Sequence, residues 1–246
     1  LCACGQKDTQ TGSDIKTVTA GKLTMSTNAQ FPPYESVADD GKGYEGTGFE
    51  GIDIEIAYAL AQKLGLELVV DDMDFDSALS AVQTGKSDIV AAGVTVTPER
   101  QNTMCFTDSY ANGVQVVIVK EGSDIKSIDD LEGKKIGTQR GTTGYSYCTD
   151  DYGEDSVVAF DDGATAVQNL LAGKVDCVVI DKAPAQEYVK ANAGLTILDT
   201  EYANENYAIG LGKDNTALQE ALNKALAELQ ADGTIQSIID KYIPSK

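Results

Sequence analysis

IDIEIAYALAQKLGLELVV, residues 52–70, joins a helical pattern directly to a strand pattern. Its first part repeats large apolar residues at helical spacing, and Gly65 is typical of the left-handed residue that ends a helix. The β-rich run LELVV (66–70) follows at once, and another β-rich run, KLTMST (22–27), comes before the helix. This order predicts a strand-helix-strand unit and therefore parallel strands.

The alternation of strand and helix patterns continues along the chain. Two segments, 78–93 and 166–181, resemble each other because each reads helix, glycine and strand, which supports two similar lobes. We therefore predict an α/β fold with two sets of mainly parallel strands flanked by helices. Further strand patterns lie at 88–93, 113–119, 134–138, 156–160, 176–180 and 206–212, and helical patterns lie at 77–85, from about 143, up to 173, from 214 and at 234–243.

The composition excludes several kinds of function. The chain has 246 residues, of which 42% are apolar, so it can bury a core as one large or two small domains. Its formal net charge of -20 repels phosphate backbones and anionic lipid headgroups, and we expect no nucleic-acid partner. The absence of histidine excludes Ser-His-Asp and Cys-His catalysis and histidine-ligated metal and haem sites. We expect neither a metal nor a cofactor.

The cysteines fall into two groups. Cys105, Cys148 and Cys177 are spread through apolar stretches without CxxC spacing, so no zinc site is indicated. The simplest interpretation is that these three are small buried apolar residues. The alternative is a disulfide between Cys148 and Cys177, if the fold brings them together.

The other two cysteines lie in the N-terminal sequence LCACG (1–5), which a polar stretch without regular periodicity follows. This segment resembles the end of a bacterial lipoprotein signal peptide, with Cys4 as the lipidated residue. The alternative is an arbitrary start of the chain. No later stretch approaches the roughly 20 consecutive apolar residues of a membrane span. We therefore predict a tether over residues 1–20 and attachment to the cell membrane through lipid.

Two loops that follow predicted strands could bind an anion. VTVTPER (94–100) comes after the strand at 88–93, and ligands of α/β proteins bind beyond the carboxyl ends of parallel strands. Arg100 could bind a carboxylate with two parallel hydrogen bonds. The Thr95 hydroxyl and the Gly93 N–H could then donate to the remaining lone pairs of that carboxylate. QRGTTG (139–144) opens a helix, whose free N–H groups would attract a carboxylate or phosphate. The alternative there is a simple helix cap at Thr142.

Two further features complete the set of candidates. Asp181 directly follows the apolar strand at 176–180, where it could receive an ammonium group or simply cap the next helix. NAQFPPYE (28–35) follows the first strand, and its paired prolines hold an extended loop that exposes aromatic side chains.

These four features occur together and in order, and with them the sequence resembles the family 3 solute-binding proteins of bacterial ABC importers for polar amino acids. That class includes histidine, lysine/arginine/ornithine and glutamine binders. The resemblance runs from about Lys22 to Tyr242. The motifs that carry it are FPPYE (31–35), GIDIEIAYALAQKLG (51–65), GKSDIVAAGVTVTPER (85–100), FTDSY (106–110), LEGKKIGTQRGTTG (131–144), GKVDCVVID (173–181) and ALNKALAELQADGTIQSIIDKY (221–242).

The resemblance implies a two-lobed periplasmic-binding-protein fold of type II with a two-strand hinge. Lobe 1 would comprise residues 21–111 and 207–246, and lobe 2 would comprise residues 112–206. The chain would cross between the lobes near 111–115 and 205–207. Because the ligand contacts are split between the lobes, binding would favour closure of the cleft.

The resemblance also implies how the head of an amino acid is held. Arg100 matches the arginine that grips the ligand α-carboxylate, helped by Thr95, Thr143 and the backbone of Gly93. Thr142 lies beside Thr143 in the same turn. Asp181 matches the acid that holds the α-ammonium group.

The resemblance assigns the ligand side chain to other residues. Phe31 and Phe75 match rings that sandwich it. Asn28 lies where binders of basic amino acids can carry an acid, which argues against a strongly cationic ligand. Gln139 and Arg140 lie on the other lobe's side of the pocket and are expected to read the side chain.

The function that the resemblance implies is extracytoplasmic binding of a polar L-amino acid for delivery to ABC permease subunits. We expect a monomer without catalytic residues. One alternative is a small-acid dehydratase on the same scaffold, with Asp181 or Glu35 as general acid. Another is the ligand-sensing module of a receptor. The sequence leaves the identity of the amino acid open.

Overall fold

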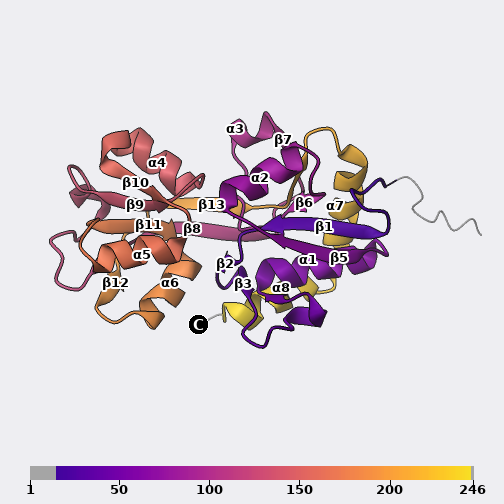
Figure 1. The fold of residues 1–246 in the computed structure, drawn as a ribbon, viewed down its shortest axis with the longest axis horizontal. Helices are drawn as coiled ribbons and strands as arrows, with labels where there is room; N and C mark the ends of the chain where they lie inside the picture. Colours follow the sequence, from indigo (N-terminus) through magenta and orange to yellow (C-terminus); the bar gives the residue numbers. More distant parts are fainter. Residues whose placement is uncertain (1–14, 245–246) are drawn as a thin grey trace, which may run out of the picture.

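The computed structural model describes residues 15–244, which form two lobes placed side by side (Figure 1). Each lobe is built on a β-sheet flanked by helices, so the predicted two-lobed α/β fold is confirmed. Cys4 and the rest of the predicted tether up to residue 14 lie outside the described residues.

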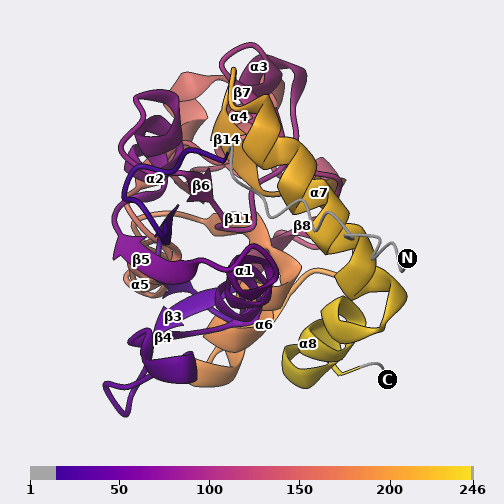
Figure 2. The ribbon, with the colours of Figure 1, turned by 90° about the vertical axis from the view of Figure 1, so that its right-hand side faces the viewer.

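The first lobe is built on a five-stranded sheet. Its strands lie in the order β5 (Glu67–Asp72), β1 (Lys22–Thr27), β6 (Ile89–Val90), β14 (Gly210–Gly212) and β7 (Met104–Phe106), and its helices are α1 (Ile52–Lys63), α2 (Phe75–Gln83), α3 (Pro98–Gln101), α7 (Thr216–Ala231) and α8 (Thr234–Tyr242). Helix α2 covers one face of the sheet, and α1, α7 and α8 lie together on the other (Figure 2).

A small antiparallel sheet packs against α1. It consists of β2 (Gln30–Phe31), β3 (Glu35–Val37) and β4 (Phe49–Glu50). This sheet matters for function because it carries Phe31 and Glu35 to the boundary between the lobes.

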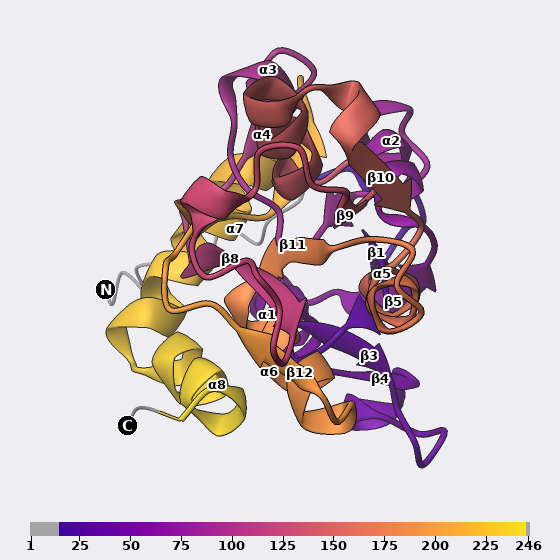
Figure 3. The same cartoon turned by 90° about the vertical axis from the view of Figure 1, so that its left-hand side faces the viewer.

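The second lobe is built on a six-stranded sheet. Its strands lie in the order β10 (Val157–Phe160), β9 (Ile136–Gln139), β11 (Cys177–Asp181), β8 (Ala111–Lys120) and β12 (Leu195–Ile197), with β13 (Ala203–Tyr207) also paired to β8, and its helices are α4 (Thr143–Tyr152), α5 (Gly163–Leu171) and α6 (Lys182–Ala191). Helix α4 lies on one face of this sheet, whereas α5 and α6 lie on the other (Figure 3). Short 3-10 turns lie at Tyr44–Gly46, Ile128–Asp130 and Glu154–Ser156.

Both sheets are mixed, which corrects the expectation of mainly parallel strands. The strands joined by helices are parallel, as predicted: β1 with β5 and β6, and β9 with β10 and β11. The remaining strand pairs of the two sheets are antiparallel. In the first lobe β14 is antiparallel to β6 and β7, and in the second lobe β8 is antiparallel to β11, β12 and β13.

The strand predicted at 206–212 is two strands that belong to different sheets. β13 pairs with β8 in the second lobe, and β14 lies between β6 and β7 in the first. Only Ala208 and Ile209, both fully buried, separate them. An apolar run therefore reads as one strand in sequence even where the chain changes lobe within it.

The two similar segments fold alike. Helix α2 leads through Gly85 into β6, and α5 leads through Gly173 into β11. Both glycines have positive φ, 74° and 73°, which a residue with a Cβ rarely adopts. The likeness noted in the sequence therefore reflects the same helix-glycine-strand unit in each lobe.

Two of the three interior cysteines are buried apolar residues, as the simpler interpretation predicts, whereas Cys105 is only partly buried and its thiol donates to the Gly212 carbonyl oxygen at 3.2 Å. Cys148 and Cys177 are fully buried free thiols in the core of the second lobe, so the alternative of a disulfide between them is wrong. Burial raises the pKa of Cys148 to about 12, which keeps this thiol protonated and unreactive.

Candidate ligand-binding site

The predicted site residues gather around one cavity between the lobes. The cavity is narrow: the centre of a water-sized sphere can reach about 20 Å³ inside it, so the lining side chains of the two lobes lie close together. Every predicted binding residue except Arg140 lines it. The full lining is Asn28, Phe31, Glu35, Phe75, Ala92, Gly93, Thr95, Arg100, Gln115, Gln139, Thr142, Thr143, Ile180, Asp181, Glu205 and Tyr207.

Arg100 lies where the two lobes meet. It belongs to α3, the short helix that Thr97 caps and Pro98 begins. Its Nη1 donates to the carbonyl oxygen of Thr95 at 2.8 Å, and its Nη2 donates at 3.0 Å to that of Gly141 in the second lobe. The guanidinium also lies over the ring of Phe75, 5.6 Å from the ring centroid. The guanidinium is therefore held at the cavity and still has N–H groups to offer a carboxylate.

The amino end of α4 faces the same cavity from the second lobe. Thr142 and Thr143 both line the cavity, and the Thr142 side chain accepts a hydrogen bond from the Tyr145 N–H at 3.3 Å. Thr142 is thus a helix cap and a lining residue at once, so the two interpretations of this turn do not compete. The unpaired N–H groups and the dipole at this end of α4 favour a negative group opposite Arg100.

Asp181 is a buried acid at the carboxyl end of β11, only 2% exposed. Its carboxylate accepts hydrogen bonds from the Ala183 N–H at 3.0 Å and from the Tyr207 hydroxyl. Burial raises the pKa of Asp181 to about 7. Asp181 therefore caps α6 and also presents to the cavity a carboxylate that a cation would stabilise.

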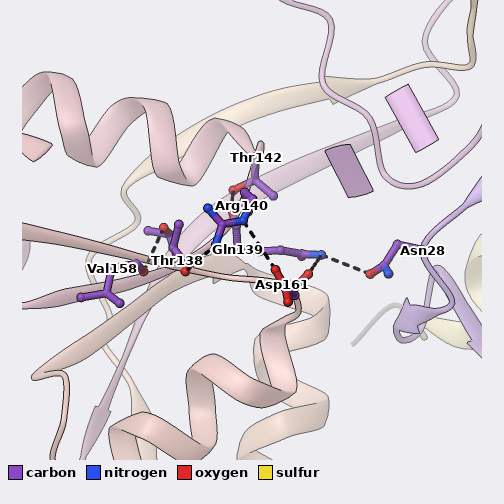
Figure 4. A network of polar contacts seen from close by, with 8 residues as sticks. Asn28, Thr138, Gln139, Arg140, Thr142, Val158 and Asp161 are labelled. Carbon is purple, nitrogen blue, oxygen red and sulfur yellow. Dashed lines mark hydrogen bonds and ion pairs between the residues drawn. The ribbon is translucent and has the colours of Figure 1, made fainter. Parts of the chain in front are cut away.

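Gln139 and Arg140 point in different directions (Figure 4). Gln139 Nε2 donates to Asn28 Oδ1 at 3.1 Å across the lobe boundary, and Asn28 Nδ2 donates to the Met73 carbonyl oxygen at 2.9 Å. Arg140 lies at the exposed surface, with its Nε 3.5 Å from Asp161 Oδ1. Successive side chains at a strand end face opposite sides, so Gln139 enters the cavity and the expectation that Arg140 does so is not met.

Two acids in the cavity lining were not predicted as ligand-binding residues. Glu35 was considered only as a possible general acid, and Glu205 only as part of the hinge. Glu205 and Tyr207 alternate along β13, so they face the same side of the strand. Gly113 of β8 lies opposite Glu205, and Gln115, two residues further along β8, is its diagonal neighbour. This alternation is the signal that could have placed Glu205 in the cavity, once the pairing of β13 with β8 was known.

Glu35 forms a buried acid pair with Asp53 of α1. The pKa of each is raised by burial, and a hydrogen bond between their carboxyl groups requires a proton on one of them. Asp53 already accepts hydrogen bonds from the Gly93 N–H at 2.7 Å and from the Tyr110 hydroxyl. Glu35 is therefore the member of the pair that carries the proton.

Residues 15–244 contain no cluster of three acidic or thiol side chains placed to hold a metal ion. Within the same range, no helix has both the length and the apolar character needed to cross a membrane.

Comparison with known proteins identifies the class. The family "bacterial extracellular solute-binding proteins, family 3" matches residues 23–245, so the chain belongs to this family. The family that the sequence resembles is thereby confirmed.

Similar individual proteins fit this assignment. The Escherichia coli K12 ABC transporter arginine-binding protein 1 is 36% identical over 92% of both chains, and the E. coli K12 L-cystine-binding protein TcyJ is 33% identical over 90% of this chain and 82% of that protein. The structure of an ancestral arginine-binding protein bound to glutamine has a TM-score of 0.85 at 40% identity, covering 92% of this chain and all of that one. All three are named as binding proteins, which supports binding over catalysis.

Proposed function

We propose that this protein is the extracytoplasmic solute-binding component of an ABC importer, and that it binds a polar L-amino acid between its lobes. The observation that carries the proposal is that Arg100 and Asp181 line the same cavity. Arg100 comes from the first lobe and Asp181 from the second. A guanidinium and a carboxylate that line one cavity match the two charged ends of an amino acid.

Each end of the ligand meets groups suited to its charge. The α-carboxylate would lie between the Arg100 guanidinium and the amino end of α4, with Thr95 and Thr143 at its sides. The α-ammonium would lie against Asp181. The Gly93 N–H, expected to help hold the carboxylate, already donates to Asp53 at 2.7 Å. A ligand that lacks either charge would leave a buried ionic group without a partner, which is costly.

The side chain would pack against Phe31 and Phe75. The relatives named above bind arginine or cystine, or hold glutamine, which are amino acids with long polar side chains. Asn28 and Gln139 supply neutral polar atoms to this part of the cavity. We therefore infer a ligand with a long side chain that ends in a polar group.

Closure of the lobes would make docking to the permease subunits depend on whether an amino acid is bound. We take the lobes to be residues 21–111 with 207–246, and residues 112–206, joined by the paired strands β8 and β13. Three hydrogen bonds already join the two lobes. They run from Arg100 to Gly141, from Gln139 to Asn28, and from the Tyr188 hydroxyl to the Gln30 carbonyl oxygen at 2.9 Å. A ligand that bridges the same boundary would favour the closed form, which the permease subunits would recognise.

The family description places its members outside the cytoplasm. We further propose a lipid anchor at Cys4, which rests on the lipoprotein-like sequence at residues 1–5.

The experiment that tests the function is calorimetry of the purified protein against a panel of L-amino acids, together with mass spectrometry of any ligand carried through purification. We expect micromolar or tighter binding of at least one polar amino acid. If no L-amino acid in the panel binds, the proposal is wrong.

A further inference from the structure

The cavity contains carboxylate oxygens that the protein itself does not satisfy. Among the described residues, the buried side-chain polar atoms that lack a hydrogen-bond partner are both carboxylate oxygens of Glu35 and Oε1 of Glu205. Both residues line the cavity. A buried acceptor without a donor is costly, so such an atom in a binding cavity indicates where a ligand should supply a donor.

The two acids differ in how this cost is removed. Glu35 can share a proton with Asp53, which gives one of its two oxygens a partner. Glu205 acts on the nearby Asp181 only through its charge, and no hydrogen bond joins their carboxyl groups. Its Oε2 accepts from Gln115 Nε2 at 3.0 Å, and its Oε1 has no partner within hydrogen-bond distance. The Tyr147 hydroxyl of α4 is a protein donor near this carboxylate, with which a ligand N–H would compete.

Glu205 also lies in the right part of the cavity to meet the ligand's head. It is 6% exposed, and its charge acts on both Arg100 and Asp181, the residues assigned to the two ends of the ligand. No ion pair joins Glu205 to Arg100 or to any other basic side chain within residues 15–244. Its carboxylate is therefore free to pair with a positive group on the ligand.

We propose that Glu205 is a second acidic ligand-binding residue, whose Oε1 accepts an N–H of the ligand's α-ammonium group beside Asp181. An ammonium group has three N–H donors, and one buried carboxylate does not exhaust them. This inference rests on the proposed function, since it assumes that the ligand is an amino acid.

Glu205 would also couple binding to the hinge. Glu205 lies on β13 and Gln115 on β8, and the bond between their side chains joins the two strands on which the chain passes between the lobes. An ammonium group held by Glu205 would thus be linked to both hinge strands, while the carboxylate of the same ligand meets Arg100 of the first lobe.

The test compares E205Q with the wild type, using whichever amino acid binds the wild type and its α-hydroxy analogue, in which a hydroxyl replaces the ammonium. Glutamine keeps the volume of Glu205 and can still accept from Gln115 through its one oxygen, so this variant removes the charge and puts an NH2 donor in place of the Oε1 acceptor. E187Q is the matched control, because it removes a carboxylate from an exposed position of the second lobe. Dissociation constants come from calorimetry, or from displacement where binding is weak.

We expect E205Q to raise the dissociation constant of the amino acid by at least tenfold, and that of the α-hydroxy analogue by less than threefold, while E187Q changes neither by more than twofold. An equal loss for both ligands, or no loss for the amino acid, would overturn the inference.

A crystal structure of the ligand complex gives a second, independent answer. The ammonium nitrogen should lie within about 3.2 Å of Glu205 Oε1. A longer separation would overturn the inference and leave the proposed function intact, whereas a wild type that binds no amino acid would overturn the proposed function itself.

Discussion

Arg100 is positioned by the protein on three sides. The Thr95 and Gly141 carbonyl oxygens each take one of its N–H groups, and the Phe75 ring lies against its flat face. A guanidinium carries five N–H donors, so several stay available for a carboxylate. A side chain fixed in this way loses little conformational entropy when the ligand binds, which favours affinity.

The first prediction concerns Arg100→Ala. Removing the guanidinium leaves the ligand carboxylate buried without its main partner, which should weaken binding by about 2 to 5 kcal/mol. Calorimetry with the best amino acid ligand measures the effect. Arg140→Ala is the control, because the chain's only other arginine lies at the exposed surface and should change affinity by less than threefold. Similar losses of affinity in both variants would contradict the assignment of Arg100 to the ligand-binding site.

The second prediction concerns pH and Asp181. Burial raises the pKa of this carboxyl to about 7, and the ligand ammonium binds its ionised form. Below pH 7 the ligand must therefore displace a proton, so affinity should fall by up to about tenfold per pH unit as the pH is lowered from 7 to 5.5, and change little from 7.5 to 8.

Titration in two buffers with different ionisation enthalpies should show proton release at pH 6. The groups that act on Asp181 are the Tyr207 hydroxyl, the Ala183 and Val114 N–H groups and the Glu205 carboxylate. Asp181→Asn should bind weakly and lose most of the pH dependence over this range. A wild-type affinity that is constant from pH 5.5 to 8 would contradict the assignment.

At the scale of elements, the loop before α4 contacts the opposite lobe closely. Gly141 has a positive φ of 78°, and a Cβ at this position would overlap the Asp76 carboxylate of α2 in the first lobe. The same residue gives its carbonyl oxygen to Arg100. Gly141 thus lets the amino end of α4 approach the first lobe.

The third prediction is that Gly141→Ala hinders lobe closure and raises the dissociation constant by about tenfold, which corresponds to about 1.4 kcal/mol. Gly153→Ala is the matched control at the other end of α4, because Gly153 has a similar φ of 87° and open space around it. Both substitutions should cost about 1 to 3 kcal/mol of folding stability, since Gly153 combines its φ with a ψ of 152°, but only the first should weaken binding.

A second substitution separates steric contact from backbone strain. Asp76→Ala removes the group that the new Cβ would meet, so the double variant should recover most of the affinity. If Gly153→Ala weakens binding as much as Gly141→Ala, or if Asp76→Ala restores nothing, the steric explanation is wrong.

At the scale of the whole molecule, the ligand should act as a bridge between the lobes. The covalent links are the chain crossings near β8 and β13, and each lobe has its own sheet. Polar contacts between the lobes include those from Gln139 to Asn28 and from Tyr188 to Gln30, and buried apolar residues of both lobes belong to one cluster. A ligand that contacts both lobes would add to the free energy that holds them together in the closed form.

The fourth prediction is that a bound amino acid raises the melting temperature. A ligand at one hundred times its dissociation constant adds about 2.7 kcal/mol of stability, which for a chain of this length is roughly 5–10 °C. Differential scanning calorimetry measures the shift. The D-enantiomer should give no shift at the same concentration, since its side chain and ammonium group exchange places. Equal shifts with both enantiomers would indicate non-specific binding.

Local patterns in the sequence were enough to predict much of the fold and the candidate site. The helix and strand patterns gave the strand-helix-strand units, because periodicity and glycine at helix ends act within a few residues. The strand-end loops located Arg100, Thr142, Thr143 and Asp181, since a strand's carboxyl end is itself a local feature. Family resemblance supplied the roles of those residues.

Tertiary structure decided what depends on contacts between distant segments. The change of lobe between β13 and β14, the opposite orientations of Gln139 and Arg140, and the arrival of Glu35 and Glu205 in the cavity all follow from strand pairing. One residue of shift along a strand exchanges its two faces, so a side chain's surroundings are fixed only when its partner strand is in register. The sequence by itself determined the elements and the charges at their ends, and the packing of two lobes decided which of those charges face one another.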